Sequence, residues 1–159
     1  MTSKNSQSRK LMFSYGMNTN LTQMARRCPT AISLGAAVLP CYKFEFKNFA
    51  TVEFDLESDV DGVLWDIQPD DEASLDVLEG YPFYYDKKMV DVIVDGITVQ
   101  AMTYFMYPEE VLGMPSKSYY NLVADGYEEH GIRLDQINDA IDRVHVKYRL
   151  TEDAFGCIM

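Results

Sequence analysis

The chain has 159 residues, 47% of them hydrophobic, which predicts one domain with a real core. A formal net charge of −11 argues against nucleic acid or an anionic membrane as the main partner, because phosphates would be repelled over most of the surface. Three cysteines without metal-like spacing are typical of free thiols in a reducing compartment. No run approaches the roughly 20 apolar residues that span a bilayer, so we expect a cytoplasmic protein.

The two ends of the chain are expected to be tails. Residues 1–10 are polar and lack an apolar segment long enough for a signal peptide. We therefore expect a disordered N-terminal tail at residues 1–10, a single domain at 11–150 and a C-terminal tail at 151–159. No internal repeat or low-complexity linker divides the sequence.

The stretch from Leu11 to Leu21 is typical of a buried strand that breaks into a tight turn at Gly16. A helix over Leu21–Arg27 should follow, because three good capping residues precede it: Asn18, Thr19 and Asn20. The free N–H groups of the turn can converge on an anion such as a carboxylate; they belong to Met17, Asn18 and Thr19. The alternative is an ordinary strand-to-helix turn.

Strands dominate the next part of the chain. Apolar and charged residues alternate over Tyr42–Lys47, after a joint marked by Pro40. A further short strand is expected at Thr51–Phe54, followed by a turn at Asp59–Gly62. The segment Val60–Ile67, which contains the only tryptophan, is predicted to be the next strand.

A hairpin is the clearest local structure in the sequence. Its strands are expected over Tyr84–Val94 and Ile97–Tyr107, joined by a type I′ turn at Asp95 and Gly96. Counting outward from this turn places three pairs on one face: Val94 with Ile97, Val92 with Val99, and Val90 with Ala101.

Three further helices are predicted, each after a polar capping residue. The first is short and acidic, is capped by Asp70 or Asp71 and runs to Glu79. The second covers Lys117–His130 and the third begins near Asp135. With strands dominating the first two thirds and helices the last, we expect an α+β fold, with a curled sheet or a small β-barrel flanked by helices.

Few side chains are obvious candidates for chemistry. His130 and His145 lie in predicted helices without a partner nearby in the sequence, so core or surface roles are favoured over catalysis. The cysteines have no local histidine, and the carboxylates at residues 70–72 are explained as a charge cluster at a helix N-terminus.

Glu79 is the exception. It ends its helix and is followed by an aromatic segment, Tyr81–Tyr85, which can desolvate a carboxyl group and raise its pKa toward neutrality. Such a group can both take and return a proton near pH 7. The structural alternative is an exposed glutamate at a helix end, beside a hydrophobic strand.

Three motifs together resemble landmarks of the γ-glutamyl cyclotransferase family and occur in that family's order. They are YGMN after the first strand, LDVLEGYPFYY, and PSKSYYNLVADGYEEHGI after the hairpin. The segment VDGVLWDI also resembles the family's strand before the catalytic helix. The similarity extends from Phe13 to Ile141 and implies a small mixed β-barrel with surrounding helices.

The resemblance implies roles for individual residues. Glu79 matches the catalytic acid/base, and Tyr119 and Tyr85 match pocket aromatics. The substrate loop corresponds to Tyr15, Gly16, Met17 and Asn18. Met17 replaces the usual serine, so any contact made by that hydroxyl is absent, and Thr19 and Asn20 also differ from the apolar residues that often follow.

The implied reaction releases 5-oxoproline and a free amino acid or amine from a small γ-glutamyl substrate. It needs no cofactor or metal, because the α-amine of the substrate lies within reach of its own γ-carbonyl. A non-catalytic member that uses the same cavity for binding is the alternative, as is an enzyme for γ-glutamylamines. We expect a monomer or a homodimer.

Overall fold

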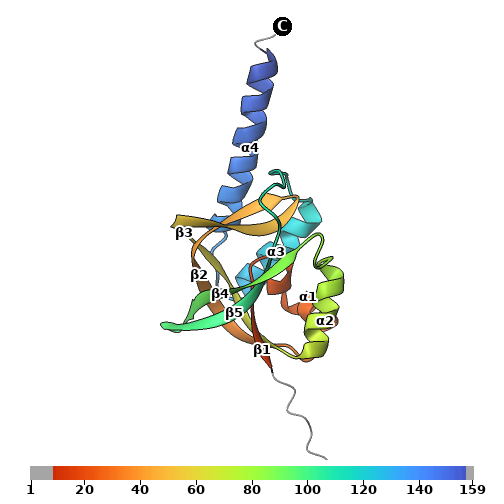
Figure 1. The fold of residues 1–159 in the computed structure, drawn as a ribbon. Helices are drawn as coiled ribbons and strands as arrows, with labels where there is room; N and C mark the ends of the chain where they lie inside the picture. Colours follow the sequence, from red (N-terminus) through yellow and green to blue (C-terminus); the bar gives the residue numbers. More distant parts are fainter. Residues whose placement is uncertain (1–8, 157–159) are drawn as a thin grey trace, which may run out of the picture.

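A computed structural model, which describes residues 9–156, contains a closed β-barrel with strand order β1-β3-β2-β4-β5 (Figure 1). The strands are β1 (Lys10–Ser14), β2 (Ile32–Lys47), β3 (Phe49–Ile67), β4 (Asp86–Val94) and β5 (Ile97–Phe105). Neighbouring strands are antiparallel except β1 and β5, which are parallel and close the barrel. The expected α+β fold with a small mixed barrel is therefore confirmed.

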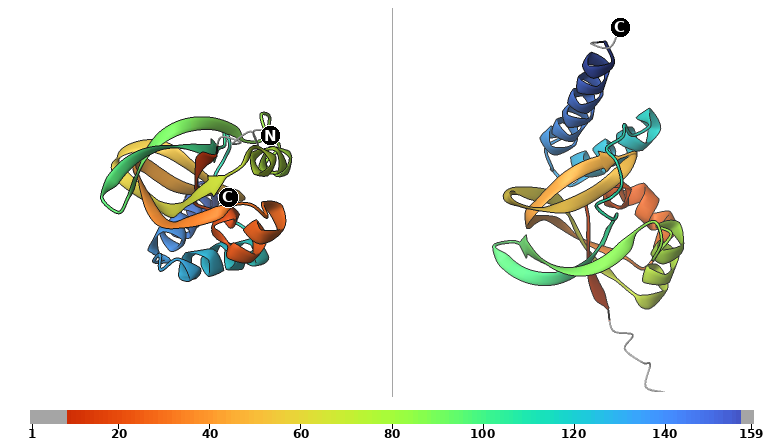
Figure 2. Two further views of the ribbon diagram at one scale, coloured as in Figure 1. Left: turned by 90° about the horizontal axis from the view of Figure 1, so that it is seen from below. Right: turned by 45° about the horizontal axis from the view of Figure 1, so that its top comes forward.

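The helices lie around the outside of the barrel (Figure 2). They are the 3₁₀ turn η1 (Met17–Thr19), α1 (Leu21–Arg27), α2 (Pro69–Leu78), α3 (Lys117–Glu129) and α4 (Asp135–Gly156). Asn20 caps α1 by accepting a hydrogen bond from the Gln23 N–H at 3.0 Å. None of these helices is both long and apolar enough to cross a bilayer.

The predicted turn at Asp59–Gly62 is wrong, because β3 runs without interruption from Phe49 to Ile67. Gly62 pairs with Ala37 of β2 and is needed for packing, since a Cβ there would lie 2.5 Å from the Phe13 ring. Pro40 does not break β2 either. The pairing register with β3 shifts between Pro40 and Tyr42 at a β-bulge, where Cys41 has φ 65°, and the strand continues beyond it.

The predicted hairpin is confirmed together with its register. Val94 pairs with Ile97, Val92 with Val99, and Val90 with Ala101. Asp95 and Gly96 have φ values of 49° and 75°, the positive values that a type I′ turn requires at both central positions. The strands are shorter than expected at their outer ends, where the flanking tyrosines lie in the connecting loops.

The helix boundaries differ from the prediction in two places. Pro69 begins α2, so its N-cap is Gln68, whose N–H donates to the Asp71 carboxylate at 2.9 Å. Helix α4 continues to Gly156 and projects away from the barrel, so the expected boundary at residue 150 falls within a helix (Figure 1). Residues 1–8 and 157–159 of the expected tails lie outside the described residues.

The loop after β1 is held between the barrel and α3. The Tyr127 hydroxyl of α3 donates to the Tyr15 carbonyl at 2.6 Å, and both side chains are buried. Gly126 permits the close approach, because a Cβ there would lie 2.2 Å from Thr19 Oγ1 and 2.7 Å from Asn20 N. The backbone from Tyr15 to Asn20 is therefore fixed by tertiary contacts.

Candidate active site

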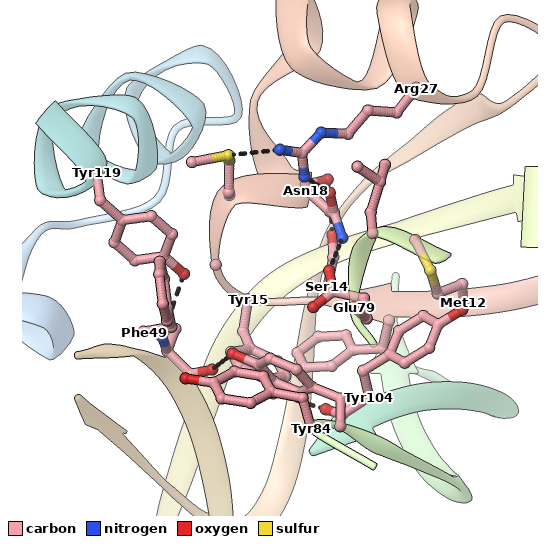
Figure 3. Close-up of a pocket in the computed structure, with 16 residues that line it drawn as sticks. Met12, Ser14, Tyr15, Asn18, Arg27, Phe49, Glu79, Tyr84, Tyr104 and Tyr119 are labelled. Atoms are coloured by element: carbon pink, nitrogen blue, oxygen red, sulfur yellow. Dashed lines mark hydrogen bonds between the residues drawn. The ribbon is translucent and has the colours of Figure 1, made fainter. Parts of the chain in front are cut away.

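A cavity of about 170 Å³ lies between the loop after β1, the end of α2 and the start of β3 (Figure 3). All seven residues predicted for the site line it: Tyr15, Gly16, Met17, Asn18, Glu79, Tyr85 and Tyr119. The structure thus brings together residues from three sequence segments in one hollow. Residues that had not been predicted also line it, among them Arg27, Phe49, Ala50 and Tyr104.

Glu79 is the C-cap of α2, with φ −83° and ψ −4°. Its side chain lines the cavity together with the loop after β1. Asn18 Nδ2 donates to Glu79 Oε1 at 2.9 Å. Burial raises the pKa of this carboxyl above its ordinary value, while the Asn18 hydrogen bond and the positive charge of Arg27 act in the opposite direction. A raised pKa makes a carboxyl group a better acceptor and carrier of a proton than an ordinary surface glutamate.

The aromatic surroundings of Glu79 are only partly those expected from the sequence. Tyr84 and Tyr85 line the cavity, but Phe83 is 89% exposed and points elsewhere. Further buried aromatic side chains come from other parts of the chain: Tyr15 directly after β1, Tyr104 on β5 and Tyr119 on α3. Neighbouring side chains in a loop point in different directions. The position of residues 81–85 next to Glu79 in the sequence therefore predicted more aromatic contacts than the structure contains.

Arg27 is a site residue that the sequence analysis missed. Its guanidinium donates through Nη1 to Asn18 Oδ1 at 2.9 Å, and its Nη2 contacts Met17 Sδ at 2.9 Å. Arg27, Asn18 and Glu79 therefore form a hydrogen-bonded chain along one wall of the cavity (Figure 3). Two adjacent arginines in the last turn of α1 were the only signal for this residue in the sequence.

The prediction that the backbone N–H groups of residues 17–19 are free to bind an anion is wrong for Thr19. Its N–H donates to the Gly16 carbonyl at 3.1 Å, because residues 17–19 form a 3₁₀ turn, and its hydroxyl donates to the same oxygen at 2.7 Å. A side chain at Gly16 would be crowded. A Cβ there would lie 3.0 Å from Ala50 Cβ and 3.1 Å from the Tyr119 hydroxyl.

The tyrosine hydroxyls differ in what they can offer a ligand. Tyr15 and Tyr85 donate their protons to the carbonyls of Tyr104 and Ala50, each at 2.6 Å. Tyr119 instead accepts the Ala50 N–H at 3.1 Å. Burial raises its pKa to about 12, and the N–H groups of Ala50 and Met17 act in the opposite direction. Since it accepts from the backbone, its own O–H proton is available to a ligand.

The other candidate residues lie outside the cavity. His130 interacts with Ser33 Oγ at 3.1 Å and with the Gly126 carbonyl at 2.8 Å, and His145 is exposed. Cys28 is buried, and desolvation raises its pKa to about 12, which makes it a poor nucleophile. Among residues 9–156, no group of three or more His, Cys, Asp and Glu side chains could hold a metal ion.

Comparison with known proteins relates this geometry to a family. Residues 12–122 match the family described as gamma-glutamyl cyclotransferase, AIG2-like. A search of curated protein sequences gives no significant match.

Among solved structures, one described as a gamma-glutamyl cyclotransferase is 24% identical with a TM-score of 0.75, and the match covers 84% of this chain and 86% of that one. An uncharacterized protein from Homo sapiens is 25% identical with a TM-score of 0.75, covering 83% and 86%. The yeast gamma-glutamyl cyclotransferase specific to glutathione is 12% identical with a TM-score of 0.55, covering 89% and 97%. Because the family match covers most of the chain and includes the loop after β1, Glu79 and Tyr119, this chain belongs to the gamma-glutamyl cyclotransferase family, AIG2-like.

Proposed function

We propose that this protein is a γ-glutamyl cyclotransferase that converts a γ-glutamyl amino acid or γ-glutamylamine to 5-oxoproline and a free amino acid or amine. The observation that carries the proposal is the placement of Glu79. Its carboxyl group is partly buried in a cavity, has a raised pKa and is held by Asn18 of the YGMN loop. Family membership supports the same reaction class.

Glu79 handles the proton in the proposed mechanism. As a carboxylate, it removes one proton from the α-ammonium group of the substrate, which frees the amine to attack the γ-carbonyl carbon. The new C–N bond closes a five-membered lactam, and the carbonyl oxygen carries the negative charge. When the bond to the leaving amine breaks, Glu79 returns the proton to that nitrogen. The carboxylate then takes the second proton from the ring nitrogen and passes it to the released amine, which leaves as an ammonium ion while the lactam keeps one N–H.

The orientation of the Glu79 carboxyl group is part of this mechanism. Asn18 Nδ2 occupies one carboxyl oxygen, Oε1, so Oε2 is the oxygen that exchanges the proton. Arg27 fixes the direction of the Asn18 amide, because its guanidinium donates to Oδ1 and leaves Nδ2 facing Glu79. Arg27 is thus a positioning residue for Glu79 that acts through Asn18.

Two further groups are assigned to the substrate. The Tyr119 hydroxyl, which accepts backbone N–H groups and has a proton to donate, supports the oxyanion that forms on the γ-carbonyl. The α-carboxylate of the substrate lies toward the loop at Gly16 and Arg27, the cationic side chain among those that line the cavity. The reaction further requires that the substrate bends so that its α-amine lies next to its own γ-carbonyl carbon, which needs no cofactor.

A turnover screen tests the proposal. The purified protein is incubated with γ-glutamyl amino acids, γ-glutamylamines and glutathione, and 5-oxoproline is measured by liquid chromatography and mass spectrometry. We expect 5-oxoproline and the free amine to appear in equal amounts. Binding of γ-glutamyl ligands without any 5-oxoproline would contradict the proposal and would identify the cavity as a binding site.

A further inference from the structure

Phe49, Leu78 and Tyr84 give the mouth of the cavity exposed apolar surface. All three side chains line the cavity, and they are 44%, 53% and 46% exposed. Isolated exposed apolar side chains are common on protein surfaces, but a group of them around one opening marks a place where a ligand is bound. The part of a substrate that extends out of the cavity must pass over these side chains.

Phe49 connects the buried and the exposed parts of this wall. Its ring packs edge to face against Tyr119, with centroids 5.1 Å apart, and against Tyr84, with centroids 6.2 Å apart. Tyr84 in turn contacts Tyr85 at 5.4 Å. The wall is held in place by the turn before β3, where Asn48 has φ 67° and its N–H donates to the Gly113 carbonyl at 3.0 Å. It therefore presents a preformed aromatic surface from the cavity floor to its rim.

The charges around the cavity are distributed unevenly. Its ionisable lining side chains, apart from the tyrosines, are Arg27 and Glu79, and both belong to the hydrogen-bonded chain with Asn18. Figure 3 shows Arg27 and Tyr84 on opposite sides of the cavity. On the Tyr84 side, no lysine or arginine side chain among the described residues lines the cavity. The Glu110 carboxylate lies near enough to add to the effect of burial, and both raise the pKa of the Tyr84 phenol. A carboxylate on the outer part of a substrate would lose water there without gaining a cationic partner.

We infer that the preferred substrates are γ-glutamyl amides of apolar amines, with an aromatic or aliphatic group and no carboxylate on the leaving side. This inference rests on the proposed function and narrows its substrate class. The γ-glutamyl part occupies the polar wall, and the amine lies along Phe49 and Tyr84.

Three substrates that share the γ-glutamyl part test the inference. γ-Glutamyl-2-phenylethylamine has a ring and no leaving-side carboxylate, γ-glutamylphenylalanine adds the carboxylate, and γ-glutamylmethylamine lacks the ring. We expect kcat/KM to be highest for the phenylethylamine derivative. Contact of its ring with the aromatic wall should be worth at least about tenfold over the methylamine derivative. The added carboxylate should lower kcat/KM, and Glu110→Gln should reduce that loss.

Matched variants assign the preference to the wall. Phe49→Ala should reduce the ratio of kcat/KM between the phenylethylamine and methylamine derivatives, and Phe49→Leu should keep part of it. Phe54→Ala is the control, because Phe54 lies on the same strand, is 67% exposed and does not line the cavity. The ratio is informative even if Phe49→Ala lowers activity in general, because a general loss affects both substrates equally.

The outcomes separate the inference from the proposed function. Equal kcat/KM for all three substrates, or a preference for γ-glutamylphenylalanine, would overturn the inference while leaving the cyclotransferase intact. If none of the three releases 5-oxoproline, the proposed function fails for them, and the inference is judged from their dissociation constants by calorimetry. The same order of affinities is then expected, and absence of binding or the reverse order overturns it.

Discussion

Replacement of Gly126 by alanine tests how α3 holds the loop after β1. Within a helix, Gly→Ala ordinarily stabilises a protein by about 1 kcal/mol, because alanine has the higher helix propensity. Here the new Cβ would lie 2.2 Å from Thr19 Oγ1, 2.7 Å from Asn20 N and 2.8 Å from Thr19 C. Two of these atoms belong to the backbone of a buried turn, so the contact cannot be relieved by rotating a side chain.

We therefore expect the sign of the effect to be reversed. Forcing extra volume into a well-packed contact costs about 1–3 kcal/mol, so Gly126→Ala should lower the free energy of unfolding. For a domain of this size, each 1 kcal/mol corresponds to a fall in Tm of about 2–4 °C. Since the displaced backbone carries Asn18, which holds Glu79, kcat/KM should fall as well.

Denaturant unfolding and 5-oxoproline release are the two assays for this prediction. Asp125→Ala is the control, because Asp125 is the exposed neighbour in the same helix and its replacement gains helix propensity without a clash. It should be as stable as the wild type or slightly more so. A Gly126→Ala variant that equals or exceeds the wild type in stability would refute the packing argument.

Three more substitutions test individual contacts of the site. Arg27→Met removes a positive charge that lowers the pKa of Glu79, so the pKa of Glu79 should rise. The acidic limb of the kcat/KM pH profile should then move to higher pH, and Arg27→Lys should move it less. An unchanged pH profile would count against the role of Arg27 in positioning Glu79. Tyr119→Phe should lower kcat by about 10²–10³-fold with little change in KM if its hydroxyl supports the oxyanion, and a change in KM alone would argue against that role. Gly16→Val brings a branched side chain against Ala50 and Tyr119, so KM should increase, and wild-type KM would contradict the close packing of the loop.

Local patterns predicted much of the fold because they depend on neighbouring residues. The hairpin register follows from Asp95 and Gly96, whose φ values suit a type I′ turn, and α3 follows from its capping serine. The errors occurred where a distant partner determines the structure. Gly62 was predicted to lie in a turn, but it lies within β3 because Phe13 of β1 packs directly over it.

The same distinction applies to the site. The motifs around Gly16, Glu79 and Tyr119 identified residues that the fold brings to one cavity. Arg27 and Phe49 could not be found in this way, because their relation to the site arises from the end of α1 and from the turn between β2 and β3. Nor could the sequence show that the N–H of Thr19 is used within its own 3₁₀ turn.

Glu79→Gln is the most direct test of the proposed chemistry. The amide is nearly the same size and keeps an oxygen that can accept from Asn18, so the free energy of unfolding should change by only about 1 kcal/mol. Because the amide cannot exchange a proton, 5-oxoproline release under saturating substrate should fall by about 10²–10⁴-fold. A folded Glu79→Gln protein that releases 5-oxoproline at the wild-type rate would contradict the assignment of Glu79 as the acid/base.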